Sequence, residues 1–118
     1  MEFTVDRQPV EGVEVLGLEG RIDIFTAPIL VKALIEVLVP GCAGAVLDID
    51  GVDSLDSTGL GLLVGGLKRA RQNGVPLQLV CTHIQILNLF RIVGLAKTFG
   101  IHPSVEDAIA AIREEPQS

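Results

Sequence analysis

The chain has 118 residues, which is enough for one folded domain with one hydrophobic core. Apolar residues make up 48 % of it, without Trp or Tyr, and such aliphatic richness favours a sheet covered by helices. The formal net charge of −6 argues against direct binding to nucleic acid, because an acidic surface repels phosphates. No apolar run approaches the roughly 18 to 20 residues that cross a bilayer, and no secretion signal opens the chain. We therefore expect a cytoplasmic protein that does not contact a membrane.

Residues that could bind a metal are scattered along the chain. Cys42 and Cys81 are not part of a C-x-x-C pair, and His83 and His102 are the only histidines. Zinc sites normally use paired ligands, so we expect no metal and no other cofactor. Both cysteines are expected to be small hydrophobic residues that stay reduced, with a redox switch between them as the alternative.

The chain begins with the pattern of a β-hairpin, followed by a helix. Residues 3–8 and 13–23 favour strands, and turn-forming residues at 9–12 lie between them. A helix is expected after Thr26, a good capping residue, with Pro28 in its first turn. Its apolar stripe consists of Leu30, Ala33, Leu34, Val37 and Leu38.

The rest of the chain alternates strands with helices. The expected elements are strand 44–50, helix 58–72, strand 77–81, helix 84–93, strand 97–102 and a helix that starts after Ser104. The first strand–helix–strand unit in this series predicts a parallel pair. The residues of helix 84–93 expected to face inward are Ile86, Leu89, Phe90 and Val93.

These elements predict an α/β fold with a mixed sheet of about four to five strands and about four α-helices. We expect a single domain over residues 1–118, with the hairpin at about 1–20 and a flexible C-terminal tail at about 114–118. The protein is expected to be a monomer or a weak dimer.

The helix over 58–72 carries four glycines, and each costs roughly 0.5 to 1 kcal/mol relative to Ala inside a helix. Its expected inward face is Leu60, Leu63, Val64 and Leu67. That face leaves toward the sides or the solvent Thr58, Gly61, Leu62, Gly65 and Gly66. Close approach of another backbone would explain the glycines, and an exposed Leu62 favours a partner protein. The basic residues at 68–71 are expected to form a solvated helix face.

Three small polar residues, Asp56, Ser57 and Thr58, stand where this helix begins, and one of them is expected to be the N-cap. An exposed serine at a helix N-terminus is also well placed for phosphorylation, because free amides and the helix dipole stabilise a phosphate there. If the loops converge, the phosphate would lie among Asp23, Asp53 and Asp56 and change the local charge strongly.

Three segments of the chain are distinctive, namely GRIDIFTAP, DIDGVDSLDSTGLGLLVGGLKRAR and ILNLFRIVGLAKTFGIHPSVEDAIAAI. Together they resemble the anti-sigma-factor antagonists, the bacterial members of the STAS domain family, over nearly the whole chain. The resemblance implies that Ser57 is phosphorylated by the partner, an anti-sigma factor that is itself a serine kinase. Thr58 is the second candidate acceptor. The unphosphorylated protein would bind this kinase and release a sigma factor, and a phosphatase would remove the phosphate.

The resemblance also implies a partner-binding surface at the start of the glycine-bearing helix. Asp23 matches an acidic position of the family, whereas Arg21 stands where the family commonly has Glu. The expected contact residues are Asp23, Asp56, Ser57, Thr58, Gly59, Gly61, Leu62 and Gly65. Such a domain would be a substrate of phosphoryl transfer and would not itself be an enzyme.

Two other functions compete with this interpretation. The segment AVLDIDGV has the D-x-D pattern of aspartyl phosphatases, with Asp48 and Asp50 on one face of a strand, although few acidic residues follow that could complete a magnesium site. STAS domains also occur as regulatory parts of anion transporters and lipid-transport complexes. A nucleotide-binding P-loop is not indicated, because GLGLLVGG lacks the required Lys and Ser or Thr.

Overall fold

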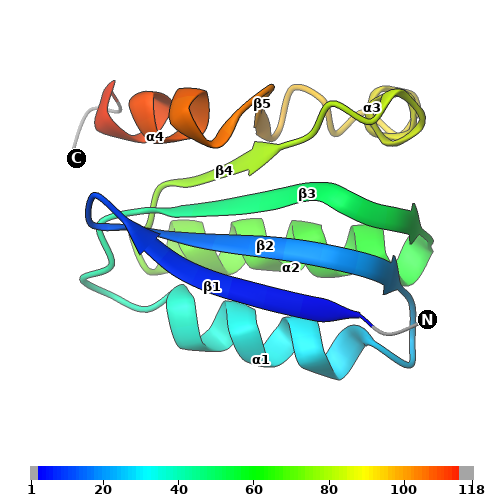
Figure 1. The fold of residues 1–118 in the computed structure, drawn as a ribbon, viewed down its shortest axis with the longest axis horizontal. Helices are drawn as coiled ribbons and strands as arrows, with labels where there is room; N and C mark the ends of the chain where they lie inside the picture. The colour runs from blue at the N-terminus through cyan, green and yellow to red at the C-terminus, as the bar shows by residue number, and fades with distance from the viewer. Residues whose placement is uncertain (1–2, 115–118) are drawn as a thin grey trace.

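The computed structural model describes residues 3–114, and these residues form an α/β domain with five strands and four helices (Figure 1). The strands are β1 (Thr4–Val10), β2 (Val13–Ile22), β3 (Ala45–Leu55), β4 (Leu77–Val80) and β5 (Gly100–His102). The helices are α1 (Ala27–Val37), α2 (Ser57–Gln72), α3 (Ile84–Ile92) and α4 (Val105–Glu114). The predicted fold class is confirmed.

The five strands form one mixed sheet in the order β1-β2-β3-β4-β5. β1 and β2 are antiparallel, as the hairpin pattern predicted, and Glu11 and Gly12 make the turn with φ angles of 52° and 86°. The other neighbouring pairs are all parallel, including β3 and β4 on either side of α2. β3 is longer than predicted and continues to Leu55, because it pairs with β2 as far as Ile22.

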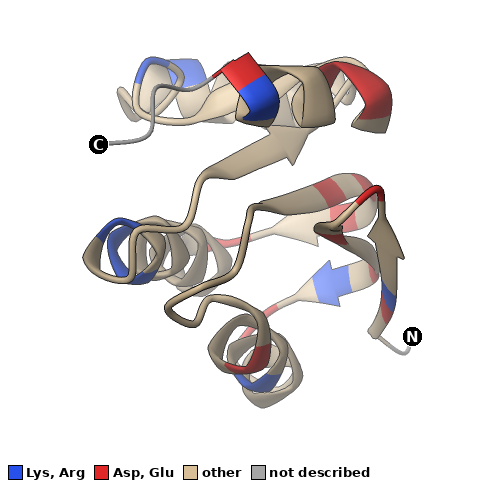
Figure 2. Ribbon diagram, turned by 90° about the vertical axis from the view of Figure 1, so that its left-hand side faces the viewer, with Lys and Arg blue, Asp and Glu red and all other residues tan. Residues whose placement is uncertain are grey.

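Helices cover the two faces of the sheet unequally (Figure 1). α1 and α2 pack together on one face, where leucines such as Leu16, Leu47 and Leu79 point. α4 packs on part of the other face, over β3, β4 and β5. The cluster beneath α4 consists of Val13, Val15, Val46, Val80, Ala108, Ile109 and Ile112. The remainder of that face is open, and Figure 2 shows acidic residues on its strands.

Most predicted core positions are buried, but in α3 Leu89 is only partly buried and Val93 is exposed. Ile86 and Phe90 are buried, and the Phe90 ring lies 5.9 Å from that of Phe99 between ring centroids. Val93 was expected to face inward but is 47 % exposed, because α3 ends at Ile92 and Val93 follows it as the C-cap. The helical stripe therefore stops one turn earlier than the sequence suggested.

The ends of the chain are described only in part. The predicted tail at 114–118 begins with Glu114, which is the last residue of α4, and residues 115–118 lie outside the described residues. At the start of α4, the Ser104 hydroxyl accepts a hydrogen bond from the Asp107 amide at 3.1 Å, as the capping pattern predicted. No helix within residues 3–114 is both long and apolar enough to span a bilayer.

Candidate functional site

The candidate site lies where β2 and β3 end side by side. The register pairs Arg21 with Ser54 and Ile22 with Leu55, so the loops that follow the two strands leave the sheet as neighbours. A shallow hollow of about 280 Å³ lies between them. Its lining residues are Arg21, Ile22, Asp23, Ser54, Leu55 and Asp56. The structure thus brings together two segments that are about 30 residues apart in the sequence.

Asp56 is the N-cap of α2. Its backbone is extended, and its carboxylate accepts a hydrogen bond from the Gly59 amide at 3.0 Å. Ser57 is therefore the first residue of the helix, and its side chain is exposed and has no hydrogen-bond partner among residues 3–114. Thr58 is partly buried. The hydroxyl that the resemblance singled out is the more accessible of the two.

Asp23 organises the loop on the other side of the hollow. Its carboxylate accepts hydrogen bonds from the amides of Phe25 and Thr26 at 2.9 and 3.1 Å. Thr26 is the N-cap residue of α1, as expected, but its side chain makes no cap bond. The Thr26 hydroxyl instead donates to the carbonyl of Arg21 at 2.8 Å and accepts from the Asp23 amide at 3.0 Å. Asp23 is thus at the site, with its carboxylate engaged inside the loop.

This loop presents two apolar side chains that no periodic pattern in the sequence indicated. Ile24 is 69 % exposed and Phe25 is 87 % exposed. The signal in the sequence was an apolar pair between Asp23 and Thr26, directly after a strand and outside any periodic pattern. The Ile24–Phe25 pair gains significance from the loop before Ser57, which only the folded structure places next to it.

The four glycines of α2 serve two different purposes. Gly61 and Gly65 are exposed, and a Cβ atom at either would meet nothing within 4 Å. Together with Ser57 they are spaced by four residues and form one open stripe along the helix. Gly59 and Gly66 are buried instead, and Gly66 was wrongly expected to point toward the sides or the solvent.

The buried glycines allow other elements to pack closely on α2. A Cβ at Gly66 would lie 3.3 Å from Leu34 Cδ1 in α1, and one at Gly59 would clash with Leu55 and lie 3.0 Å from Ile22 Cγ2. Leu62 was expected to be exposed, but it is partly buried and packs against the core. Leu60 and Val64 are likewise only partly buried, so the inward face is turned toward α1 relative to the prediction.

The charges around the hollow differ from the expected set. Asp23 and Asp56 both line it, but Asp53 is exposed on β3 and is not part of the lining. Arg21 lines the same hollow and adds one positive charge beside the two carboxylates. A phosphate on Ser57 would therefore meet two nearby carboxylates and one guanidinium instead of three carboxylates.

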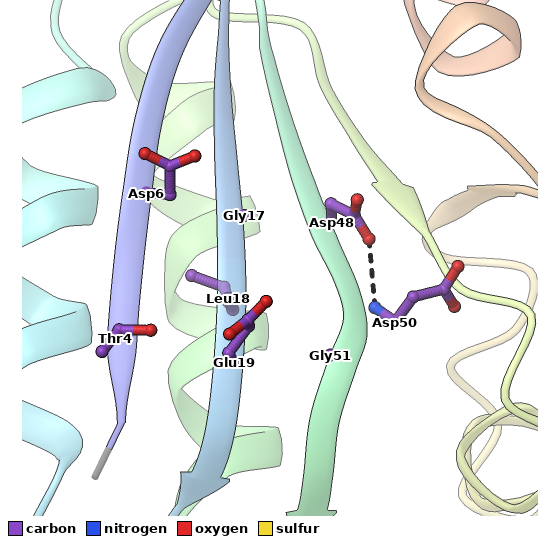
Figure 3. Close-up of a pocket in the computed structure, with 8 residues that line it drawn as sticks. All are labelled: Thr4, Asp6, Gly17, Leu18, Glu19, Asp48, Asp50 and Gly51. Carbon is purple, nitrogen blue, oxygen red and sulfur yellow. Dashed lines mark hydrogen bonds between the residues drawn. The ribbon is translucent and has the colours of Figure 1, made fainter.

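A second hollow of about 320 Å³ occupies the open part of the sheet, on the face that carries α4 (Figure 3). Its lining residues are Thr4, Asp6, Gly17, Leu18, Glu19, Asp48, Asp50 and Gly51. Asp48 accepts a hydrogen bond from the Asp50 amide at 3.1 Å, and Asp50 accepts from the amide and the hydroxyl of Thr82. Asp50 thus joins the strand β3 to Thr82, which follows β4. Within residues 3–114, no group of three or more His, Cys, Asp or Glu is placed to hold a metal ion.

The two cysteines are free thiols in different surroundings. Cys81 is buried, and burial raises the pKa of its thiol, which keeps it in the protonated form. Cys42 is partly buried, and its Sγ contacts the carbonyl of Gly44 at 3.4 Å. His102 forms a hydrogen bond with buried Gln78 at 2.8 Å, which is a structural role.

Comparison with known proteins identifies the family. The chain is 33 % identical over 87 residues to an anti-sigma-B factor antagonist of Staphylococcus aureus, which covers 74 % of this chain and 81 % of the relative. It is 30 % identical to the anti-sigma-B factor antagonist of Bacillus subtilis over 92 % of this chain and 99 % of the relative. The crystal structure of an anti-sigma factor antagonist from Mycobacterium paratuberculosis superimposes with a TM-score of 0.87, at 28 % identity and 96 % coverage of both chains. A family model described as STAS domain matches residues 4–108, and the chain belongs to the STAS domain family.

Proposed function

We propose that this protein is an anti-sigma-factor antagonist whose binding to its anti-sigma factor is switched off by phosphorylation of Ser57. The relatives named above carry the antagonist function in their names. The observation that supports Ser57 as the switch is its exposed hydroxyl at the first position of α2, directly after an aspartate that already caps the helix. The acceptor is therefore free while the helix start is stable.

For the phosphoryl transfer, this protein only has to present Ser57 to the kinase. Ser57 Oγ would form a bond to the γ-phosphorus of ATP held by the kinase, and the bond from that phosphorus to the β–γ bridging oxygen would break. ADP leaves, and the serine proton passes to a base of the kinase. The phosphate then lies at the N-terminus of α2, where helix amides and the macrodipole favour an anion. The protein is a substrate of this transfer and not an enzyme.

The same phosphate would act against the partner. Gly61 and Gly65 leave the backbone of α2 bare beside Ser57, so a partner can approach closely along this stripe. A doubly charged group at the head of the stripe, beside Asp23 and Asp56, would have to lose its water in the complex and would hold the partner away from the bare helix. Binding is expected to be lost until a phosphatase removes the phosphate.

The proposal is tested by capture and by mapping of the modified residue. Immobilised Ser57→Ala protein is used to capture its partner from a lysate of the source organism, and the captured protein is identified by mass spectrometry. That partner is then purified and incubated with wild-type protein and ATP. We expect an anti-sigma factor that transfers phosphate to Ser57; a phosphopeptide carrying the label on Thr58 or Ser54 would overturn the assignment.

A further inference from the structure

Two neighbouring apolar side chains are exposed beside the proposed switch. Phe25 is 87 % exposed and Ile24 is 69 % exposed, the former being the most exposed large hydrophobic residue among residues 3–114. Single exposed hydrophobic residues are common on protein surfaces and require no explanation. An Ile and a Phe in succession, directly after Asp23 at a hollow that Asp56 also lines, are a different case. Each would release apolar surface from water on binding.

The loop holds these side chains outward by specific hydrogen bonds. The Asp23 carboxylate accepts from the Phe25 amide at 2.9 Å and from the Thr26 amide at 3.1 Å. The Thr26 hydroxyl donates to the Arg21 carbonyl at 2.8 Å and so closes the turn on β2. Because the backbone is already ordered, a partner that takes up Phe25 loses little free energy to ordering the loop.

The loop and the switch share one supporting surface. Ile22 pairs with Leu55 in the sheet, and both side chains pack against Gly59 in the first turns of α2. Ile24 follows Ile22 by two residues, and Ser57 follows Leu55 by two residues. Asp23 and Asp56, which directly precede Ile24 and Ser57, line one hollow, so a partner that covers this hollow lies next to both the Ile24–Phe25 loop and Ser57.

We propose that Ile24 and Phe25 form an apolar anchor by which the anti-sigma factor recognises this antagonist, an inference that rests on the proposed function. The occupant is that kinase, through an apolar pocket with Lys or Arg at its rim. A basic rim is complementary to the hollow, where the carboxylates of Asp23 and Asp56 outnumber the one guanidinium of Arg21, and to the net charge of −6. Central aromatic residues of this kind commonly dominate the binding energy of an interface.

The test measures binding without interference from phosphorylation. Affinity for the purified anti-sigma factor is determined by calorimetry with Ser57→Ala protein and with Ser57→Ala combined with Ile24→Ala, Phe25→Ala or Ile92→Ala. Ile92 is the matched control, since it is 80 % exposed and lies on α3 outside the hollow. We expect Phe25→Ala to weaken binding at least about tenfold and Ile24→Ala to weaken it less, with Ile92→Ala within about twofold of the parent. All variants should melt like the parent, because these side chains are largely exposed.

A kinetic measurement separates recognition from chemistry. With Ser57 intact, Phe25→Ala should raise the KM for phosphorylation by a similar factor and leave kcat unchanged, since Phe25 does not touch the reacting atoms. Affinity that is unchanged in Phe25→Ala, while Ser57 is still phosphorylated, would overturn the anchor and leave the proposed function standing. If wild-type protein neither binds the anti-sigma factor nor accepts phosphate, the proposed function fails and the anchor with it. A dimer that dissociates on Phe25→Ala, with kinase affinity unaltered, would assign the surface to a second copy of this chain and reject the proposal.

Discussion

The Asp56 carboxylate accepts a hydrogen bond from the Gly59 amide at 3.0 Å. Asp56 therefore caps the helix, and the hydroxyl of Ser57, which lies between these two residues in the chain, is not needed for capping. Ser and Thr are themselves common capping residues, so Ser57 or Thr58 could have filled this role. With Asp56 in place, Ser57 is the first residue of the helix, and its exposed side chain has no hydrogen-bond partner within residues 3–114. A phosphate could therefore be added to Ser57, as proposed, without removing the cap.

A charge at position 57 should abolish binding without unfolding the protein. A negative side chain at a helix N-terminus is favourable by roughly 0.3 to 1 kcal/mol, so Ser57→Asp should melt at or above the wild-type temperature. Against a partner surface, an unpaired buried charge typically costs about 3 to 5 kcal/mol, or two or more orders of magnitude in affinity. Calorimetric binding and thermal melting of wild type, Ser57→Ala and Ser57→Asp make the comparison. An Asp variant that binds as tightly as the Ala variant would contradict the electrostatic switch.

Loss of the cap should destabilise the fold modestly. Asp56→Ala removes the acceptor for the Gly59 amide and is expected to lower the free energy of unfolding by about 1 kcal/mol, with a range of about 0.5 to 2 kcal/mol. Asp56→Asn is the control, because its side-chain oxygen can still accept the bond. Urea denaturation measures both. Equal loss of stability in the two variants would show that the negative charge, and not the cap bond, is what matters.

The glycines of α2 should divide into two classes when they are replaced by alanine. Gly61→Ala has open space for its Cβ and should stabilise the fold by roughly 0.5 to 1 kcal/mol through helix propensity, while weakening partner binding. Gly59→Ala should destabilise it, because the new Cβ would collide with Leu55 and crowd Ile22. Chemical denaturation and kinase affinity are measured on the same samples. If Gly61→Ala protein binds the kinase with normal affinity, close approach of the partner to the α2 backbone does not explain that glycine.

The cysteines should not participate in the switch. Burial raises the pKa of Cys81, so its thiolate is rare at neutral pH, and alkylation by iodoacetamide should be much slower in native than in urea-unfolded protein. Cys42→Ser and Cys81→Ser should both bind the anti-sigma factor within about twofold of wild type. Binding that differs between oxidised and reduced protein, and loses that dependence in either variant, would restore the redox alternative.

The raised pKa of Cys81 also predicts a sign for the pH dependence of stability. Its folded pKa lies above the unfolded value, so its contribution is complete below the unfolded pKa and is lost as the pH rises through the folded one. The free energy of unfolding of wild type should therefore fall more steeply than that of Cys81→Ser above about pH 9. Parallel slopes from pH 8 to 10 would show that the buried thiol does not contribute.

Local patterns in the sequence were sufficient for the order of strands and helices, the fold class and the position of the candidate site. The hairpin at the start, the caps at Asp56 and Ser104 and the stripe of α1 depend on contacts between residues close in the chain. Periodicity and capping depend only on residues within a few positions of one another, so they can be recognised directly in the sequence. The motif around Ser57 was visible for the same reason.

Contacts between distant segments decided the rest. Periodicity shows which residues of α2 share a side, but only packing against Leu34 of α1 and against Ile22 and Leu55 of the sheet determined that Gly66 and Gly59 are buried and Gly61 and Gly65 are open. The Ile24–Phe25 loop lies beside the loop that leads to Ser57 because β2 and β3 are parallel and Ile22 pairs with Leu55, a pairing that local sequence does not specify. Helix and strand propensities depend on residues that are close in the chain. Burial depends on which distant residues pack against a side chain, and only the folded chain determines those contacts.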